Sequence, residues 1–175
     1  MSMSSKKKVK ILLLGLANSG KTSIALSLQK NTNLLAYTSL RPTRGIEISE
    51  FEDDDSEFVI WDFGGQERYR TRHTEKFEGL ITNTSEIIYV IDVQDEKNYI
   101  LAIDFLRECL RMLKAEGYLT DLSIFLHKFD SNYKFDQEKI KEFITNIKGN
   151  IPDGFKYKIY NTTIFTVFNK AESTF

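Results

Sequence analysis

The chain has 175 residues, of which 41% are hydrophobic and 28% charged, a composition typical of one soluble globular domain and not of a disordered chain. The net charge of −1 gives no overall basic field, so no nucleic acid is expected as a partner. The single cysteine, Cys109, excludes an internal disulfide and fits a reducing compartment. With no run of about 20 apolar residues and no lipidation motif, we expect a cytoplasmic protein without an intrinsic membrane anchor.

Apolar runs alternate along the chain with segments of helical periodicity. Residues 9–15 form a continuous apolar run, as in a strand buried on both faces, and a helix is predicted from Gly20 to residue 30. Two strands, 46–52 and 57–63, are predicted to form a hairpin around an acidic turn. Further strands are predicted at 85–93, 122–129 and 157–164. Two more helices are predicted from apolar residues at helical spacing, namely Ile100, Ile103, Leu106, Leu110 and Leu113, and Ile140, Phe143, Ile144 and Ile147.

This alternation predicts an α/β fold with a doubly wound, mostly parallel six-stranded sheet and helices on both faces. The hairpin supplies one antiparallel edge. We expect a flexible N-terminus over residues 1–8 and a single domain over 9–175, whose C-terminal helix is cut short. Ligands bind such sheets at the carboxyl ends of the strands, so the motifs that follow strands are expected to lie at one edge.

A phosphate-loop motif follows the first predicted strand. GLANSGKT, at 15–22, matches G-x-x-x-x-G-K-[ST] and stands before a predicted helix. Two glycines allow the backbone N–H groups to turn onto phosphate oxygens, while Lys21 is expected to reach the β- and γ-phosphates and Thr22 to offer a hydroxyl to Mg²⁺. The sequence therefore predicts a nucleoside phosphate site, with contacts from Gly15, Ala17, Asn18, Ser19, Gly20, Lys21, Thr22 and Ser23.

A second motif, IWDFGGQER at 60–68, offers groups for the metal ion and for water. Asp62, at a strand end, is expected to hold Mg²⁺ through a water molecule. The backbone N–H of Gly65 is expected to approach a γ-phosphate, and Gln66 to orient an attacking water. Thr43, in RPTRG at 41–45, is a candidate to complete the Mg²⁺ shell while a γ-phosphate is present.

A histidine, a lysine and an aspartate stand together where the apolar strand SIFL ends, in HKFD at 127–130. These residues alone assign no role, since polar residues commonly follow a strand. Together with GLANSGKT, PT-x-G and WDFGGQ, in this order and spacing, they make the chain resemble a Ras-superfamily small GTPase over residues 8–171. PT-x-G and WD-x-GGQ resemble Arf-like proteins, whereas HKFD and YNTTIF at 160–165 resemble the Rag/Gtr branch. Our placement is a Rag/Gtr-like GTPase domain with Arf-like features.

The resemblance implies roles for these base-contacting residues. Asp130 would accept hydrogen bonds from the N1–H and 2-amino groups of guanine, donors that adenine lacks. The stem of Lys128 would cover one face of the base. His127 replaces the asparagine of N-K-x-D and offers only one donor and one acceptor when neutral, so weaker holding and relaxed base selectivity are expected. Candidates to close the base pocket, which are otherwise plain strand residues, are Thr162, Thr163 and Ile164.

The resemblance also implies the activity, a GTP-binding switch that hydrolyses GTP slowly with Mg²⁺. Gln66 would position the water, while Lys21, Mg²⁺ and loop N–H groups stabilise the developing charge. Regulatory and effector proteins would read two switch loops, roughly 36–46 and 63–80, and a homo- or heterodimer with another GTPase is an expected assembly. Membrane recruitment would go through partners.

Three alternatives stay open from the sequence. The first is a poorly hydrolysing, nucleotide-dependent scaffold within a heterodimer. The second is an Arf-like trafficking GTPase, which the short polar segment 1–8 disfavours as a membrane anchor. The third is a P-loop kinase, which needs an arginine-rich lid, whereas no arginine follows Arg111.

Overall fold

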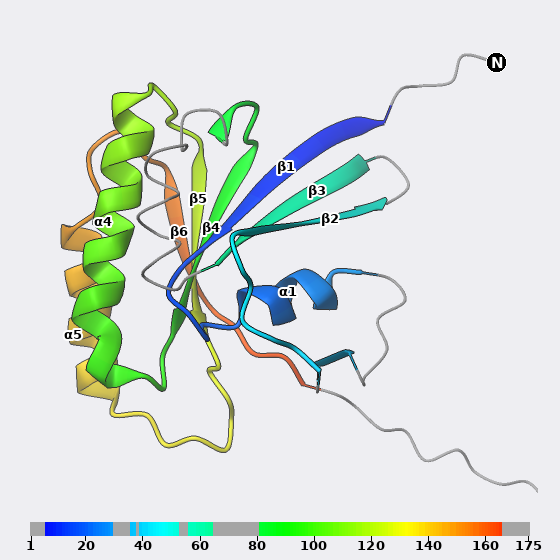
Figure 1. Ribbon diagram of the computed structural model, residues 1–175. Coiled ribbons are helices and arrows are strands. Elements are labelled where there is room, and N and C mark those ends of the chain that lie inside the picture. The colour runs from blue at the N-terminus through cyan, green and yellow to red at the C-terminus, as the bar shows by residue number, and fades with distance from the viewer. Residues whose placement is uncertain (1–5, 30–35, 38, 53–55, 65–80, 166–175) are drawn as a thin grey trace, which may run out of the picture.

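The computed structural model describes residues 6–29, 36–37, 39–52, 56–64 and 81–165, and Figure 1 shows a central sheet with helices on either side. The six strands lie in the order β2-β3-β1-β4-β5-β6. The β2–β3 pair is antiparallel, and the other four pairs are parallel. The predicted sheet with one antiparallel edge hairpin is therefore confirmed, although 53–55 of the hairpin turn lie outside the described residues. The strands are β1 (Lys7–Leu14), β2 (Ile46–Glu52), β3 (Ser56–Phe63), β4 (Glu86–Asp92), β5 (Asp121–His127) and β6 (Tyr157–Asn161).

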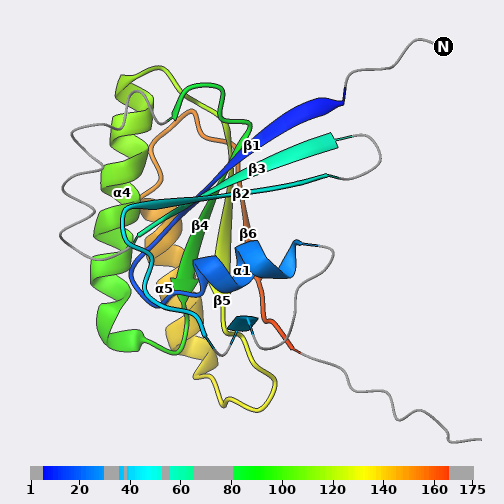
Figure 2. The ribbon, with the colours of Figure 1, turned by 45° about the vertical axis from the view of Figure 1, so that its right-hand side comes forward.

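Helices cover both faces of the sheet, as predicted. The short helix α1 (Lys21–Ser27) lies on one face, and α4 (Tyr99–Ala115) and α5 (Gln137–Gly149) lie side by side on the other, as Figures 1 and 2 show from two directions. A 3₁₀ turn, Glu96–Asn98, leads into α4, and the Asp136 side chain caps α5 by accepting from two first-turn N–H groups. None of the helices within these described ranges is long and apolar enough to cross a bilayer.

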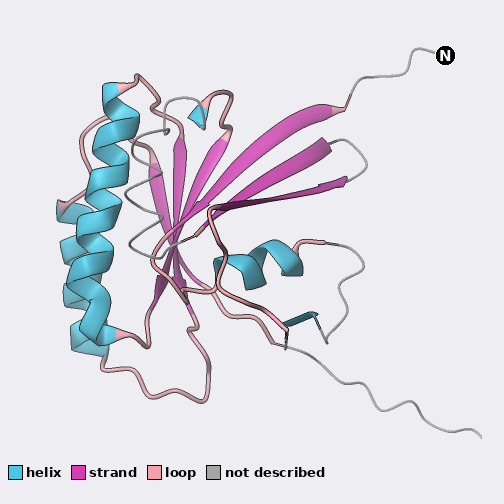
Figure 3. Cartoon of the chain, viewed as in Figure 1, coloured by secondary structure: helices cyan, strands magenta, loops and turns pink. Residues whose placement is uncertain are grey.

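The core has two layers, because alternate residues of each strand point to opposite faces. Leu12 and Tyr89 face the larger layer beneath α4 and α5, whereas Leu13 and Ile88 face the smaller layer beneath α1. Central strands buried on both sides explain the continuous apolar runs in the sequence. The five parallel-paired strands point the same way, so their carboxyl ends and the loops that follow them lie at one edge of the sheet (Figure 3).

Ile100 was predicted on the buried stripe of the α4 helix, and that prediction was wrong. Its side chain is 78% exposed. The helix begins one residue earlier, and Tyr99 takes the inward position, stacking on Phe143 with ring centroids 3.7 Å apart. Ile103, Leu106, Leu110 and Leu113 follow Tyr99 at spacings of four, three, four and three residues and are buried as predicted.

Strands β5 and β6 end earlier than the apolar pattern indicates. β5 stops at His127, and Lys128 turns the chain with a φ of 60°. β6 stops at Asn161, and the backbone of Thr162 then donates to Leu126 O at 2.9 Å and accepts from Phe129 N at 3.0 Å. The segment 162–164 is therefore a loop held against the turn after β5, and not the end of a strand.

Candidate nucleotide-binding site

The phosphate loop connects β1 to α1 and depends on two glycines. Gly15 and Gly20 have φ values of 142° and 97°, which favour glycine. A methyl group at Gly15 would lie 2.2 Å from the carbonyl oxygen of Val90, and one at Gly20 would lie 2.4 Å from Cδ2 of His127. Both positions are closed to any larger residue, so the loop keeps its backbone close to β4 and β5.

Lys21 follows the loop and is buried, with 5% of its surface exposed. Its Nζ donates to Leu16 O at 2.7 Å, to Gly15 O at 3.1 Å and to Ser19 Oγ at 3.5 Å. Burial lowers the pKa of Lys21 to about 8, although the Asp62 carboxylate acts to raise it. The hydrogen-bond partners of this ammonium are neutral oxygens, so an anionic ligand beside it would stabilise its charged form.

Three oxygen-bearing side chains meet next to Lys21. Thr22 Oγ1 donates to Asp62 Oδ2, and Thr43 Oγ1 lies 3.0 Å from Thr22 Oγ1 and 3.2 Å from Asp62 Oδ2. Asp62 is 3% exposed, and its Oδ1 is buried with no hydrogen-bond partner in the described part of the chain. Burial raises the pKa of Asp62, against hydrogen bonds from both threonines and the Lys21 charge.

This donor set fits Mg²⁺. In nucleotide sites Mg²⁺ is bound by oxygen atoms, from one or two carboxylates and from the phosphates. The site offers one carboxylate with an unpaired buried oxygen, two hydroxyls and space for phosphate oxygens. No group of three or more His, Cys, Asp or Glu side chains that could hold a metal alone occurs among the described residues. The structure thus brings together Thr22, Thr43 and Asp62, the three residues predicted as metal ligands.

The end of β3 is tied to the segment that carries Thr43. Gly64 N donates to Gly45 O at 2.8 Å, and a methyl group at Gly64 would lie 2.6 Å from the Thr43 carbonyl oxygen. Gly65 and Gln66, predicted to contact the γ-phosphate and the attacking water, lie outside the described residues. Their roles stay predictions.

A cavity of about 310 Å³ opens between the phosphate loop, the segment before β2 and the turn after β5. Its position next to the phosphate loop and Thr43 fits a nucleoside phosphate. It is lined by Ala17, Asn18, Gly20, Lys21, Thr22, Ser23, Leu40, Arg41, Pro42, Thr43 and Lys128.

His127 packs its ring against the phosphate loop. It is 4% exposed, and its Nδ1 lies 3.0 Å from Thr162 Oγ1. Burial lowers the pKa of His127, with a further lowering by the Lys128 charge and opposite effects of Asp92 and Asp130. The imidazole is therefore neutral near pH 7 and has one donor and one acceptor, as expected from the sequence.

Lys128 joins the phosphate loop to the end of β4. Its Nζ donates to Asn18 O at 2.8 Å and to Asp92 Oδ2 at 2.5 Å. The adjacent Asp130 accepts a hydrogen bond from the Thr163 hydroxyl. Of the three pocket-closing candidates, Thr162 contacts His127, Thr163 contacts Asp130, and Ile164 follows them 36% exposed.

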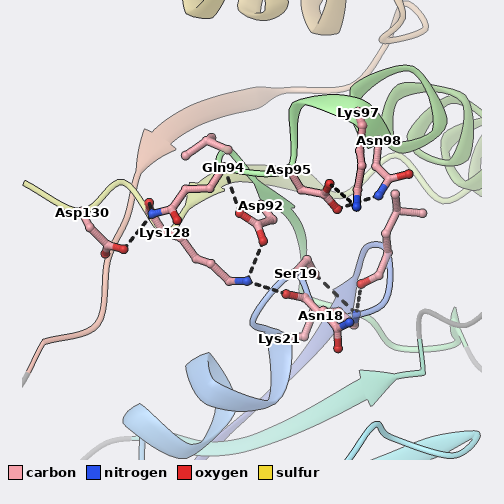
Figure 4. A network of polar contacts seen from close by, with 12 residues as sticks. Asn18, Ser19, Lys21, Asp92, Gln94, Asp95, Lys97, Asn98, Lys128 and Asp130 are labelled. Atoms are coloured by element: carbon pink, nitrogen blue, oxygen red, sulfur yellow. Dashed lines mark hydrogen bonds and ion pairs between the residues drawn. The ribbon is translucent and has the colours of Figure 1, made fainter. Parts of the chain in front are cut away.

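Sequence reasoning missed Asp92 and Gln94, which Figure 4 shows beside Lys128 and Asp130. The amide Nε2 of Gln94 donates to Lys128 O and to Asp130 Oδ2, both at 2.8 Å. Asp92 is the last residue of β4, and Asp62 stands one residue before the end of β3, so the same signal could have found Asp92. Nothing in the local pattern of the sequence indicates Gln94.

Comparisons with known proteins agree with this geometry. The model of the ADP-ribosylation factor family matches residues 1–168. The ADP-ribosylation factor-like protein alp41 of Schizosaccharomyces pombe is 32% identical over 163 residues, covering 92% of this chain and 77% of that protein. The human ADP-ribosylation factor-like protein 5A is 33% identical over 143 residues, covering 79% of this chain and 73% of that protein. The structure of the Arl6 BBS3 small GTPase from Trypanosoma brucei, with bound nucleotide analogue GppNp, superposes with a TM-score of 0.67 at 21% sequence identity. The superposition covers 90% of this chain and 87% of that one.

The fold is that of the small GTPases, as predicted. The chain belongs to the ADP-ribosylation factor family, and it is a GTP-binding switch and a GTP hydrolase. Placement in the Rag/Gtr branch is not supported, since that placement relied on the short segments 127–130 and 160–165, whereas the family match extends over 1–168. The Arf-like features identified from 41–45 and 60–66 gave the correct family.

Proposed function

We propose that this GTPase binds GTP with Mg²⁺ held by Thr22, Thr43 and Asp62, and that the presence of the γ-phosphate is read by partner proteins. The observation that carries the proposal is the meeting of these three side chains beside the buried Lys21. Asp62 Oδ1, buried and unpaired, is costly unless a ligand satisfies it. A bound metal ion with its water shell would satisfy this oxygen.

The residues around the phosphates would have different roles in binding and hydrolysis. Lys21 supplies a cation whose charge is stabilised by the phosphates, and the loop backbone between Gly15 and Gly20 supplies N–H donors. Mg²⁺, when bound, neutralises charge on the phosphate oxygens. Gln66, from its place in WDFGGQ, would position the attacking water, and Gly65 would contact the γ-phosphate through its N–H. Turnover without a partner would be slow, on the order of 10⁻⁴ to 10⁻² s⁻¹.

Thr43 would link the presence of the γ-phosphate to the conformation of the two switch segments. Its hydroxyl contacts Thr22 and Asp62 across a sequence separation of about 20 residues, and its segment is tied to the end of β3 through the Gly45–Gly64 hydrogen bond. Contacts to a γ-phosphate would therefore order segments 36–46 and 63–80 together. Regulatory and effector proteins would read that order.

Asp130 would read the base. A carboxylate has about four lone-pair sites, and Thr163 and Gln94 each use one, on different oxygens. One site on each oxygen is then left for the N1–H and 2-amino groups of guanine. His127, with a single donor and a single acceptor, would hold the nucleotide less tightly than asparagine.

Assembly and location complete the proposal. We further propose a cytoplasmic protein that partners recruit to a membrane surface, and a homo- or heterodimer with another GTPase. The second candidate is a poorly hydrolysing scaffold within such a heterodimer, and GTP turnover by the protein alone distinguishes it from the first.

The first experiment is chromatography of the nucleotide released when freshly purified protein is denatured. We expect stoichiometric guanine nucleotide, and the GDP share reports turnover by the protein alone. GTP without GDP would favour the scaffold. An empty site would require micromolar titrations and fits weak holding by His127. Adenine nucleotide would contradict the role of Asp130.

A further inference from the structure

Gln94 holds a position that neither the phosphate-loop chemistry nor the base contact of Asp130 explains. It follows β4, is half-buried, and places one amide nitrogen 2.8 Å from both Lys128 O and Asp130 Oδ2 (Figure 4). Both partners are pure acceptors, a carbonyl and a carboxylate. The side chain must therefore present its NH₂ group to them and not its oxygen.

The turn that carries Gln94 is fixed at several points. The backbone N–H of Gln94 donates to Asp92 Oδ1 at 2.9 Å. The other oxygen of Asp92 accepts from Lys128 Nζ, which also donates to Asn18 O in the phosphate loop. Because Asp92 is bound to the turn and to Lys128 together, Gln94 is held in place from its backbone before its amide meets Asp130.

The Asp130 carboxylate, in contrast, is on a turn and has a soft torsion. Rotation about the Cβ–Cγ bond of aspartate is broad and roughly two-fold, so the side chain itself does not fix the orientation of the carboxylate plane. Gln94 holds Oδ2 and the Thr163 hydroxyl holds Oδ1, and these donors come from two different segments. Donors on both oxygens fix the plane of the carboxylate.

Guanine demands such a plane. Its N1–H and 2-amino donors are parallel and coplanar with the ring, so they reach two carboxylate oxygens only when those oxygens lie in the plane of the base. We propose that Gln94 is a positioning residue that sets guanine selectivity by holding the Asp130 carboxylate in this plane. The proposal depends on the proposed role of Asp130.

The test compares GDP with inosine diphosphate, which keeps N1–H but lacks the 2-amino group. Affinities are measured by competition against a fluorescent GDP analogue with Mg²⁺ present. Gln94→Met keeps the length and the apolar stem but removes the donor. We expect it to weaken GDP by about tenfold and inosine diphosphate by about two- to threefold, so that the preference for GDP falls at least about threefold. Lys97→Ala, three residues away with its side chain 84% exposed, is the matched control and should leave the preference unchanged.

In Gln94→Glu the preference for GDP should depend on pH. If Gln94 only supported the fold, no such dependence would be expected. At pH 8 the introduced carboxylate repels Asp130, and the preference for GDP should fall further than in Gln94→Met. At pH 5.5 a proton shared between the two carboxyl groups restores a donor, so the preference should return toward the wild-type value measured at the same pH.

Two outcomes would overturn the proposal, and a third variant separates it from the proposed function. An unchanged preference in Gln94→Met, or equal weakening of both nucleotides, would show that Gln94 only supports the fold. A pH-independent preference in Gln94→Glu would have the same meaning. Asp130→Asn should abolish the preference. If Asp130→Asn abolishes the preference while the Gln94 variants match wild type, the role of Gln94 is refuted and the proposed role of Asp130 is not. If Asp130→Asn keeps the preference, the proposed role of Asp130 fails as well.

Discussion

The phosphate end and the base end of the site are built in different ways. At the phosphate end, a contiguous loop of eight residues, 15–22, supplies the backbone shape, and a single buried cation supplies the charge. At the base end, side chains from the ends of β4, β5 and β6 hold one another through Lys128, Gln94 and Thr163. A local backbone motif fixes the first region, whereas only the register of three strands fixes the second. Mutations should therefore cost most affinity at the phosphate end and change selectivity at the base end.

The largest effect is expected from Lys21→Met. Loss of the buried cation should weaken GDP binding by about 100- to 1,000-fold. The same change should stabilise the nucleotide-free protein by about 1 to 3 kcal/mol, because burial lowers the pKa of Lys21 from 10.5 to about 8 and the charged form is held at a cost. Calorimetric titration and thermal unfolding measure the two effects. Lower stability of the nucleotide-free variant would contradict the assigned cost.

Gln66→Leu should remove turnover and spare binding. We expect single-turnover GTP hydrolysis to fall by at least about 100-fold, because a positioned water is lost, while GDP affinity changes by less than about twofold. Unchanged hydrolysis would remove Gln66 from its proposed role. Lys21→Met, which loses binding, is the contrasting variant.

Removal of the metal should weaken nucleotide holding through the phosphate end of the site. With excess EDTA, we expect GDP release to accelerate by about tenfold or more, since charge on the phosphates is no longer neutralised. In Asp62→Asn, release should already be fast and EDTA should add little. If EDTA has the same effect on both proteins, Asp62 is not part of the metal site.

The affinity for GDP should depend on alkaline pH through Lys21. Below about pH 8 the lysine is charged in the free protein, and above that value it must take up a proton when the phosphates bind. Affinity should therefore fall about five- to tenfold between pH 7 and pH 9. The stability of the nucleotide-free protein changes in the opposite sense: the cost of burying the charge is present below pH 8 and is relieved as the pH rises toward 10.5. Comparison with Lys21→Met isolates this contribution, and a flat difference across the range would disprove it.

The smallest effect is expected at the base end. His127→Asn restores an amide where the neutral imidazole offers one donor and one acceptor, and GDP should bind about two- to fivefold more tightly. The gain is small because the buried ring also fills space against Gly20. Weaker binding by this variant would mean that packing of the ring outweighs its poorer hydrogen bonding.

The difference between the two regions also decides what could be predicted from the sequence. The phosphate loop was predictable because glycine spacing and a following lysine encode a local backbone shape. Asp62 and Thr43 were predictable from their positions next to strands. Gln94 was not, because its partners lie 34 and 36 residues further along the chain and only the parallel register of β4 and β5 brings them together.

Two predictions were wrong for different reasons. The exposure of Ile100 follows from a helix start one residue earlier than the apolar spacing indicates. The Rag/Gtr placement gave too much weight to HKFD, a motif of four residues. In the structure its histidine contacts Thr162 and its lysine contacts Asp92 and Asn18.

The contact between His127 and Gly20 has a consequence for nucleotide release. Because the ring leaves no space above the glycine, the loop under the phosphates cannot rise without pushing the histidine away from Thr162. Lys128, anchored on Asn18, follows the same movement. The contacts that hold the phosphates and the contacts that hold the base are therefore coupled. We therefore expect a partner protein that displaces the loop at either end to weaken binding at both ends.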